Sequence, residues 1–248
     1  MTEAEGGTAG ARSAPHGFED RAKNWLRWAR TPDFDAYWLY RDAFFSELVP
    51  PPGKATLEIG CGEGRVARDL RARGHRVVAV DASPTLVEAA AALDAGSEYL
   101  VGNAEALPFE DSRFDLVVSY NTLMDVDNMP RAVAEAARVM TPHGRLAVCV
   151  THPVSDSGDF VHDGEDAAFE IPITYFGARA FHFHAERGGL TMDFDGWAFD
   201  LESYSRALEE AGLAIERIRE PQPSGEERLP RRRRIPNFLM FRALRLPT

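Results

Sequence analysis

Residues 55–64, Ala-Thr-Leu-Glu-Ile-Gly-Cys-Gly-Glu-Gly, decide the fold of this chain. Thr56, Leu57 and Ile59 form a short apolar and β-branched run that stops at three closely spaced glycines, and residues 65–73 continue with a helical pattern. The pattern predicts a strand, a tight turn and the start of a helix. Glycine suits such a turn because it tolerates backbone angles that side chains disfavour and lets a ligand approach the main chain closely. The free N–H groups at the helix start would face a ligand above the end of the strand.

The spacing of the glycines separates two classes of ligand. A dinucleotide-binding turn has G-x-G-x-x-G/A, and its third small position falls on Arg65 in this sequence. Glu58 places a carboxylate at the mouth of the pocket, where it would repel a pyrophosphate and attract an ammonium group. The composite Glu58-x-Gly60-x-Gly62-x-Gly64 resembles the first motif of the class I S-adenosylmethionine-dependent methyltransferases.

Length and composition limit the number of domains and the kinds of partner. With 248 residues and 44% hydrophobic content, the chain can bury one substantial core with a small cap. Its net charge of −11 disfavours a broad surface for nucleic acid or an anionic membrane. Two cysteines, Cys61 and Cys149, indicate neither a disulfide framework nor a metal-type pair. No apolar run approaches the ~20 residues of a membrane span. Residues 1–17 are interpreted as a disordered tail without a signal peptide, so a cytoplasmic location is expected.

The second predicted strand, residues 75–81, ends in a carboxylate. Asp81 follows Gly64 at a spacing typical of a strand end that meets a nucleoside ribose, with Ala82 beside it. Both S-adenosylmethionine and NAD would use this contact. The alternative is that Asp81 caps the next helix, although Ser83 before Pro84 is the better cap.

Asn103 follows a third short strand at residues 97–102. The segment from Asn103 resembles the third motif of the same family, which implies that Asn103 meets the exocyclic amine of adenine while Ala104 and Glu105 offer backbone groups to the ring edge. The alternative is an Asx-turn at the strand end. The residues assigned to the cofactor are Glu58, Gly60, Cys61, Gly62, Asp81, Ala82, Asn103, Ala104, Glu105, Tyr120 and Tyr37.

The fourth predicted strand, residues 114–119, leads into Tyr120-Asn121-Thr122-Leu123-Met124-Asp125 at the ligand-presenting edge of an α/β sheet. Family members that methylate DNA bases or glutamine amides carry Asp/Asn-Pro-Pro-Tyr at this position. This chain has Ser-Tyr-Asn-Thr instead, which argues against those substrates. The predicted acceptor contacts are Asn121, Met124, Trp38 and Phe176.

Two residues are candidates for a general base. Asp125 ends the loop just described, and His152 follows a fifth strand at residues 145–151. A histidine with an ordinary pKa near 6.5 suits proton removal at neutral pH. The alternative is that His152 holds the turn before Pro153.

The regions around the core are rich in aromatic residues. Residues 18–49 predict two helices separated at Thr31-Pro32-Asp33, which either pack onto the sheet or form a lid with Tyr37, Trp38 and Arg41 as candidates. Residues 155–167 form an acidic loop, and residues 171–194 predict a hairpin with its turn at 187–189. This hairpin either shapes the acceptor pocket or closes a small core of its own.

The predicted fold class is α/β. A helix at residues 201–211 and strands at 213–219 and 237–246 follow the hairpin, and the arginines of 231–234 are interpreted as part of a solvated loop. The resemblance implies a Rossmann-like, seven-stranded, mostly parallel sheet with helices on both faces, in which one strand at the end runs antiparallel. The predicted segments are a tail (1–17), a helical lid (18–53), the cofactor-binding core (54–151), an acceptor-side β-hairpin cap (152–197) and the rest of the sheet (198–248).

The resemblance implies a function as well as a fold. It predicts methyl transfer from S-adenosylmethionine to an O or N atom of a small molecule, for example a secondary metabolite, with no metal. Two alternatives stay open: an NAD-dependent oxidoreductase, and a non-catalytic S-adenosylmethionine-binding sensor or partner protein. No nucleic-acid or membrane partner is expected, and a homodimer is an open alternative.

Overall fold

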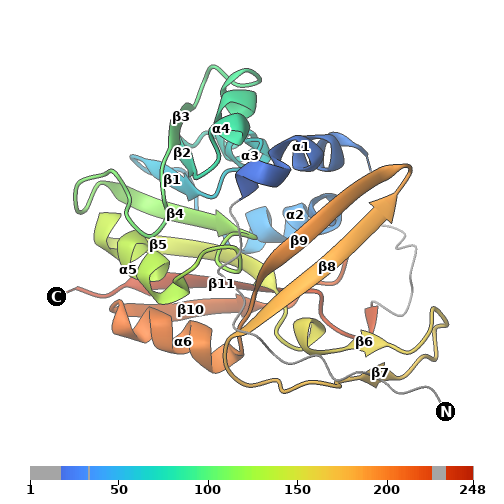
Figure 1. Cartoon of the computed structure of the whole chain (residues 1–248). Coiled ribbons are helices and arrows are strands. Elements are labelled where there is room, and N and C mark those ends of the chain that lie inside the picture. The colour runs from blue at the N-terminus through green and yellow to red at the C-terminus, as the bar shows by residue number, and fades with distance from the viewer. Residues whose placement is uncertain (1–17, 33, 225–232, 248) are drawn as a thin grey trace, which may run out of the picture.

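The structure is a computed structural model that describes residues 18–32, 34–224 and 233–247. Its centre is a seven-stranded sheet in the order β10-β11-β5-β4-β1-β2-β3 (Figure 1). The neighbouring pairs from β5 to β3 are parallel, and β11 runs antiparallel to both β10 and β5. The strands are β1 (Thr56–Ile59), β2 (Val77–Asp81), β3 (Glu98–Val101), β4 (Phe114–Tyr120), β5 (Met140–Thr151), β10 (Leu213–Arg219) and β11 (Phe238–Arg245). The predicted fold class is confirmed.

Helices cover both faces of the sheet. They are α1 (Ala22–Arg30), α2 (Tyr37–Glu47), α3 (Arg65–Ala72), α4 (Pro84–Ala91), α5 (Met129–Val139) and α6 (Leu201–Glu210), with short 3-10 helices η1 (Phe18–Arg21) and η2 (Ser155–Ser157). Helices α2 and α3 bury aromatic and aliphatic side chains against one face, while α5 and α6 do so against the other. The α4 cap is the one expected, since the hydroxyl of Ser83 accepts a hydrogen bond from the Leu86 N–H at 3.2 Å.

The path of the chain through the sheet determines where a ligand can bind. The chain runs outward from β1 to β2 and β3, and then returns to β4 on the other side of β1. Loops that leave β1 and β4 therefore diverge at the carboxyl ends of these strands, and an open α/β sheet binds its ligands in the crevice so formed.

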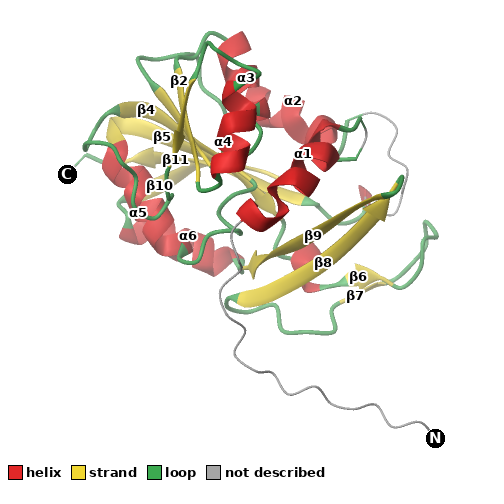
Figure 2. Ribbon diagram, turned by 45° about the horizontal axis from the view of Figure 1, so that its top comes forward, coloured by secondary structure: helices red, strands yellow, loops and turns green. Residues whose placement is uncertain are grey.

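Two elements outside the sheet lie near these strand ends. A long hairpin is formed by β8 (Arg179–Arg187) and β9 (Leu190–Ala198), and Figure 2 shows α1 between this hairpin and α4. A smaller two-stranded sheet pairs β6 (Asp159–Phe160) with β7 (Phe169–Glu170). The predicted N-terminal helices and inserted hairpin are thus present.

Some predicted boundaries differ from the structure. The hairpin begins at Arg179 instead of residue 171: Pro172 has no N–H for a strand ladder, and Gly177 adopts a left-handed φ of 77° just before β8. The fifth strand begins at Met140 instead of residue 145, and it contains a bulge where His143 adopts a left-handed φ of 63° and the pairing with β4 shifts register. The acidic loop at 155–167 contains η2 and β6. The tail predicted at residues 1–17 lies outside the described residues.

The structure also shows the lengths of the helices and the state of the two cysteines. Among the helices of the described residues, none is both long and apolar enough to cross a membrane. Cys61 and Cys149 are both free thiols and both buried.

Candidate active site

A cavity of about 230 Å³ lies at the carboxyl ends of β1, β2 and β4. The glycine turn after β1 forms its floor, while η1 and α1 supply its aromatic cover. It is lined by Phe18, Trp25, Glu58, Gly60, Cys61, Gly62, Glu63, Arg65, Val66, Asp81, Ala82, Leu86, Gly102, Asn103, Ala104, Glu105, Asn121, Thr122, Asp125, Val126 and Asp127. Most of the residues that the sequence assigned to the cofactor therefore meet in one cavity.

Gly60 brings the β1 turn against the loop that follows β4. Its φ is 69°, and a side chain there would overlap Thr122, whose Cβ lies 2.7 Å from the position of an added Cβ. The hydroxyl of Thr122 donates a hydrogen bond to the Ile59 carbonyl at 3.1 Å. Only glycine satisfies both the backbone angle and this close packing.

Asp81 closes the side of the cavity at the end of β2. Its carboxylate accepts hydrogen bonds from the N–H groups of Gly62 at 2.8 Å and Ser83 at 2.9 Å. Burial raises the pKa of this carboxyl, and the two N–H donors oppose that increase. These bonds fix the carboxylate beside the glycine turn, where it can accept ribose hydroxyls.

Glu58 and Arg65 bring opposite charges into the same cavity. Burial raises the pKa of Glu58 well above its ordinary value, with a further increase from Asp81 and a decrease from Arg65. One carboxyl oxygen of Glu58 and one guanidinium nitrogen of Arg65, Nη1, are buried and have no hydrogen-bond partner among the described residues. Arg65 is held by Asp35 at 3.1 Å and lies over the ring of Tyr37 at 4.4 Å. Buried polar atoms are usually hydrogen-bonded, and these two could pair with an ammonium and a carboxylate of one ligand.

The β3 end of the cavity has the predicted polar loop. The side-chain oxygen of Asn103 accepts a hydrogen bond from the Glu105 N–H at 2.8 Å, which is the Asx-type bond that the sequence left as an alternative. Glu105 in turn accepts from the Asn128 N–H at 2.8 Å. Asn103 still lines the cavity, so its amide nitrogen and the adjacent backbone can meet a ring edge.

The loop after β4 contributes Asn121 and Asp125. Asn121 has a left-handed φ of 53°, and its buried side-chain oxygen has no partner. Burial raises the pKa of Asp125 to about 8, with Arg21 lowering it and Asp81 raising it further. A carboxyl whose pKa is close to neutral pH can take up or release a proton.

Two contacts of η1 hold it over the cavity, next to the start of α1. Glu19 accepts hydrogen bonds from Ser83 and from the Thr85 hydroxyl, the latter at 2.7 Å, at the start of α4. Arg21 forms an ion pair of 2.7 Å with Asp195 of β9. Between these contacts Phe18 and Trp25 line the cavity, with their rings 5.8 Å apart. The aromatic cover of the cavity therefore comes from η1 and α1.

Several predicted site residues lie behind the cavity instead of on it. Tyr37 and Tyr120 are buried with their ring centroids 5.2 Å apart, and the Tyr37 hydroxyl donates to Asp69. The ring of Tyr37 packs against the Arg65 guanidinium. Met124 is buried in the core on the α5 and α6 face.

Trp38, Phe176 and His152 also lie away from the cavity lining. Trp38 is 42% exposed and Phe176 is 76% exposed. His152 is buried, with Nε2 2.8 Å from Glu220 and Nδ1 accepting from the Val154 N–H at 3.1 Å. Burial lowers the pKa of His152 and Glu220 opposes this. These contacts correspond to the alternative in which His152 holds the turn before Pro153.

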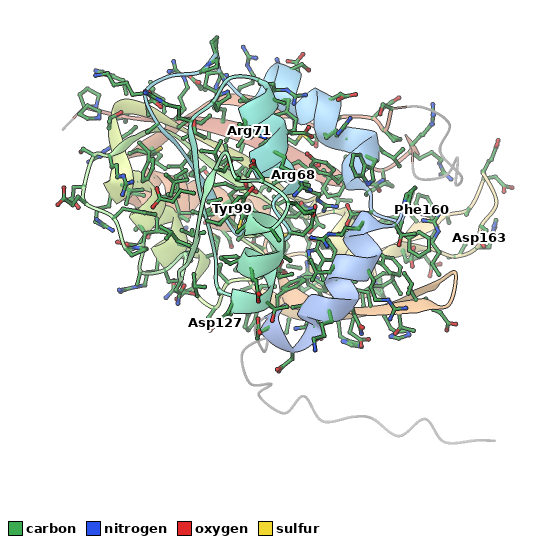
Figure 3. The ribbon with its side chains drawn as sticks, turned by 90° about the horizontal axis from the view of Figure 1, so that it is seen from above. Arg68, Arg71, Tyr99, Asp127, Phe160 and Asp163 are labelled. Atoms are coloured by element: carbon green, nitrogen blue, oxygen red, sulfur yellow. The ribbon has the colours of Figure 1, made fainter. Side chains whose placement is uncertain are left out.

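Sequence reasoning missed the cavity contacts of Phe18, Trp25, Thr122 and Asp127. The aromatic content of the first helices indicates a lid, but of the α2 candidates Tyr37 packs against the sheet face and Trp38 is exposed. In the sequence, Arg65 argues only against a dinucleotide. Its position directly after Gly64, at the start of α3, was the available signal. Figure 3 shows Arg68 and Tyr99, which lie against Gly64 on the other side of this turn.

The fold and the cavity define a Rossmann-like α/β protein with a nucleoside site at the point where the strand order reverses. Residues 57–148 match the family described as "Methyltransferase domain". The match covers the cofactor-binding core, the part of the chain that resembles the class I S-adenosylmethionine-dependent methyltransferases.

Relatives of known name share the central part of the chain. It is 37% identical over 93 residues to the malonyl-[acyl-carrier protein] O-methyltransferase of Serratia marcescens, covering 38% of this chain and 36% of that protein. This chain is also 37% identical over 118 residues to the ubiquinone/menaquinone biosynthesis C-methyltransferase UbiE of Dinoroseobacter shibae. That match covers 44% of this chain and 47% of UbiE. The matches thus span less than half the length of these relatives.

Solved structures extend the similarity of fold to most of the chain. A crystal structure of an S-adenosylmethionine-dependent methyltransferase from Mesorhizobium loti superposes with a TM-score of 0.69 at 21% identity, covering 86% of this chain and 99% of that one. The cofactor implied by the family fits the residues present. The unpartnered atoms of Glu58 and Arg65 match an amino acid zwitterion, and Asp81 matches a ribose.

Proposed function

We propose that this protein transfers a methyl group from S-adenosylmethionine to an O or N atom of a small molecule. The observation that carries this proposal is the pair of buried, unpartnered atoms on Glu58 and Arg65 beside Asp81. An ammonium group and a carboxylate on one ligand would satisfy both atoms, and a ribose on the same ligand would reach Asp81. Few ligands other than an adenosyl amino acid carry all three groups.

Each part of the cavity has a defined role in this reaction. The bound cofactor supplies a methyl group on a positively charged sulfur, which an acceptor atom can displace. Glu58 would receive the ammonium, Arg65 the carboxylate and Asp81 the ribose hydroxyls. Phe18 and Trp25 exclude water above them. Orienting two reactants in this way supplies much of the rate enhancement, so no protein nucleophile is needed.

Asp125 is the group placed to move a proton during transfer. It lines the cavity and its pKa of about 8 lies near neutral pH, whereas His152 is engaged by Glu220. We therefore assign the base to Asp125. Positioning of the acceptor would fall to Asn121, which lines the same cavity.

The surroundings of the cavity favour a small acceptor. The η1 and α1 lid and the net charge of −11 suit neither a duplex nor an anionic membrane surface. Two buried free thiols are compatible with the cytoplasmic location proposed from the sequence. A homodimer stays a prediction.

Two other functions use the same kind of turn. An NAD-dependent oxidoreductase is disfavoured because the buried Glu58 would face a pyrophosphate and Arg65 replaces the third small residue. A non-catalytic S-adenosylmethionine-binding protein would keep Glu58, Arg65 and Asp81 but would have no use for a titratable Asp125.

The test separates binding from transfer. Protein is incubated with methyl-labelled S-adenosylmethionine and with extracts divided into small-molecule, protein and nucleic-acid fractions. We expect label in the small-molecule fraction only. Label in protein or nucleic acid would contradict the acceptor class, and binding without transfer would favour the sensor.

A second experiment tests the zwitterion site. Glu58→Gln and Arg65→Lys should each weaken S-adenosylhomocysteine about tenfold, a typical loss for one charge-assisted hydrogen bond. The same variants should bind methylthioadenosine, which lacks the amino acid group, as well as the natural protein does. Equal losses for both ligands would contradict the assignment.

A further inference from the structure

The charged side chains that line the cavity are mainly acidic. Six acidic side chains line the cavity against one basic side chain, Arg65: Glu58, Glu63, Asp81, Glu105, Asp125 and Asp127. Charges this close together are costly unless each has a partner. The partners of these carboxylates therefore indicate which charges are left for a ligand.

Four of the six carboxylates have partners or an assigned ligand group. Glu63 is held by both of its oxygens at 2.9 Å from Arg68. Asp81 and Glu105 accept backbone N–H groups, and Glu58 is assigned to the cofactor ammonium. Asp125 and Asp127 remain, both from the loop after β4.

Asp125 is the more enclosed of these two. Its side chain makes no hydrogen bond within the described part of the chain, while Asp127 is exposed at the rim. Arg21 is the basic group that acts on Asp125, but its guanidinium already donates to Asp195 at 2.7 Å and to the Asp193 carbonyl at 3.0 Å. Asp125 thus forms no ion pair with a basic side chain of the described residues.

The other polar group of this wall is Asn121. Its side-chain oxygen is buried without a partner, and its left-handed backbone keeps it at the end of β4. Together, Asn121 and Asp125 present hydrogen-bond acceptors to the cavity. Phe18, Trp25 and Val126 add apolar and aromatic surface, which favours a cation with a carbon skeleton.

Resting on the proposed methyl transfer, we infer that the acceptor is an amine that enters as an ammonium ion, bound and deprotonated by Asp125. The carboxylate takes one proton from the ammonium and becomes a carboxylic acid. The freed lone pair forms a C–N bond to the methyl carbon as the C–S bond breaks, and the electron pair of that bond goes to sulfur. The product is a methylated ammonium ion, so charge and atoms balance.

The titration of Asp125 suits this proton transfer. Its pKa of about 8 results from burial, with Arg21 of η1 lowering it and Asp81 of β2 raising it. An arriving ammonium would lower that pKa and so favour the ionised carboxylate. A carboxylate acceptor would instead meet the repulsion of Asp125 and Asp127.

The experiment uses three ligands with one skeleton. Phenethylamine, phenethyl alcohol and hydrocinnamate differ in an amine, a hydroxyl and a carboxylate head group. Each is titrated calorimetrically into the full chain saturated with S-adenosylhomocysteine. We expect the amine to bind about tenfold or more tightly than the other two, as a charge-assisted contact predicts. Equal binding of all three, tighter binding of the acid or alcohol, or binding of none overturns the inference.

A matched pair of variants tests the role of Asp125. Asp125→Asn should weaken phenethylamine about tenfold and leave S-adenosylhomocysteine affinity unchanged, because it removes one charge from the acceptor side only. Asp163→Asn removes a charge from the loop between β6 and β7, which Figure 3 places at an edge of the molecule away from Asp127, and should change neither. Unchanged amine affinity in Asp125→Asn overturns the inference.

Two further outcomes distinguish a failure of the amine assignment from a failure of the proposed methyl transfer. If Asp125→Asn weakens S-adenosylmethionine but neither S-adenosylhomocysteine nor the amine, Asp125 serves the sulfonium and the amine assignment is wrong. If the natural protein binds neither adenosyl ligand, the proposed function itself has failed.

Discussion

Replacing Gly60 by alanine tests whether the β1 turn and the Thr122 loop build the cavity together. Alanine at a φ of 69° is strained by roughly 1–2 kcal/mol. Its Cβ would also overlap the Thr122 side chain, and a forced shift of that kind costs about 1–3 kcal/mol more. We therefore expect the free energy of unfolding to fall by roughly 2–5 kcal/mol.

Gly212 is a matched control because it shares the backbone conformation without the crowding. Its φ is 71°, and an added Cβ would meet nothing within 4 Å. Gly212→Ala should cost only the roughly 1–2 kcal/mol of backbone strain and leave S-adenosylmethionine affinity unchanged. Urea unfolding measures the first quantity and calorimetric titration the second. If Gly60→Ala destabilises no more than Gly212→Ala, or keeps full cofactor affinity, the reasoning is refuted.

Three further changes test individual side chains. Asp81→Ala should weaken S-adenosylmethionine by about 2–4 kcal/mol, because the ribose loses a buried charged acceptor, and unchanged affinity in titration would remove Asp81 from the site. Asp125→Asn should stabilise the protein at pH 8 and not at pH 4. Because the pKa of Asp125 is raised in the folded state, the folded protein keeps a proton between pH 4 and pH 8 that the unfolded chain releases. The stability of the natural protein therefore falls as pH rises through this range. Thermal unfolding at pH 4 and pH 8 checks this expectation. His152→Ala should lower the free energy of unfolding by about 1–2 kcal/mol, because the hydrogen bonds of His152 to Glu220 and Val154 are lost. The rate of methyl transfer should stay the same. A large loss of rate in a folded variant would restore His152 as a catalytic group.

The parts of the site that the sequence predicted are those fixed by local patterns. Glu58, Gly60 and Asp81 end or follow buried strands, and the carboxyl ends of neighbouring parallel strands meet at one edge of a sheet. Their proximity therefore follows from strand order alone. Asn103 and Asn121 were found for the same reason.

The parts that the sequence could not predict depend on contacts between distant segments. The ring of His152 is held by Glu220, 68 positions away, and this partner cannot be read from the residues around His152. Trp38 and Trp25 lie on neighbouring helices of similar composition, but α2 packs its aromatic face on the sheet while α1 packs between α4 and β9. Which helix would cover the cavity was decided by tertiary packing.

The central claim is that the cavity binds an adenosyl amino acid. The most direct measurement is isothermal titration of the purified chain with S-adenosylmethionine, S-adenosylhomocysteine and NAD(H) in parallel. Our account predicts saturable one-site binding of the two adenosyl ligands and no binding of NAD(H), because it assigns an ammonium to Glu58 and a carboxylate to Arg65. Binding of NAD(H), or of none of these ligands, would contradict it.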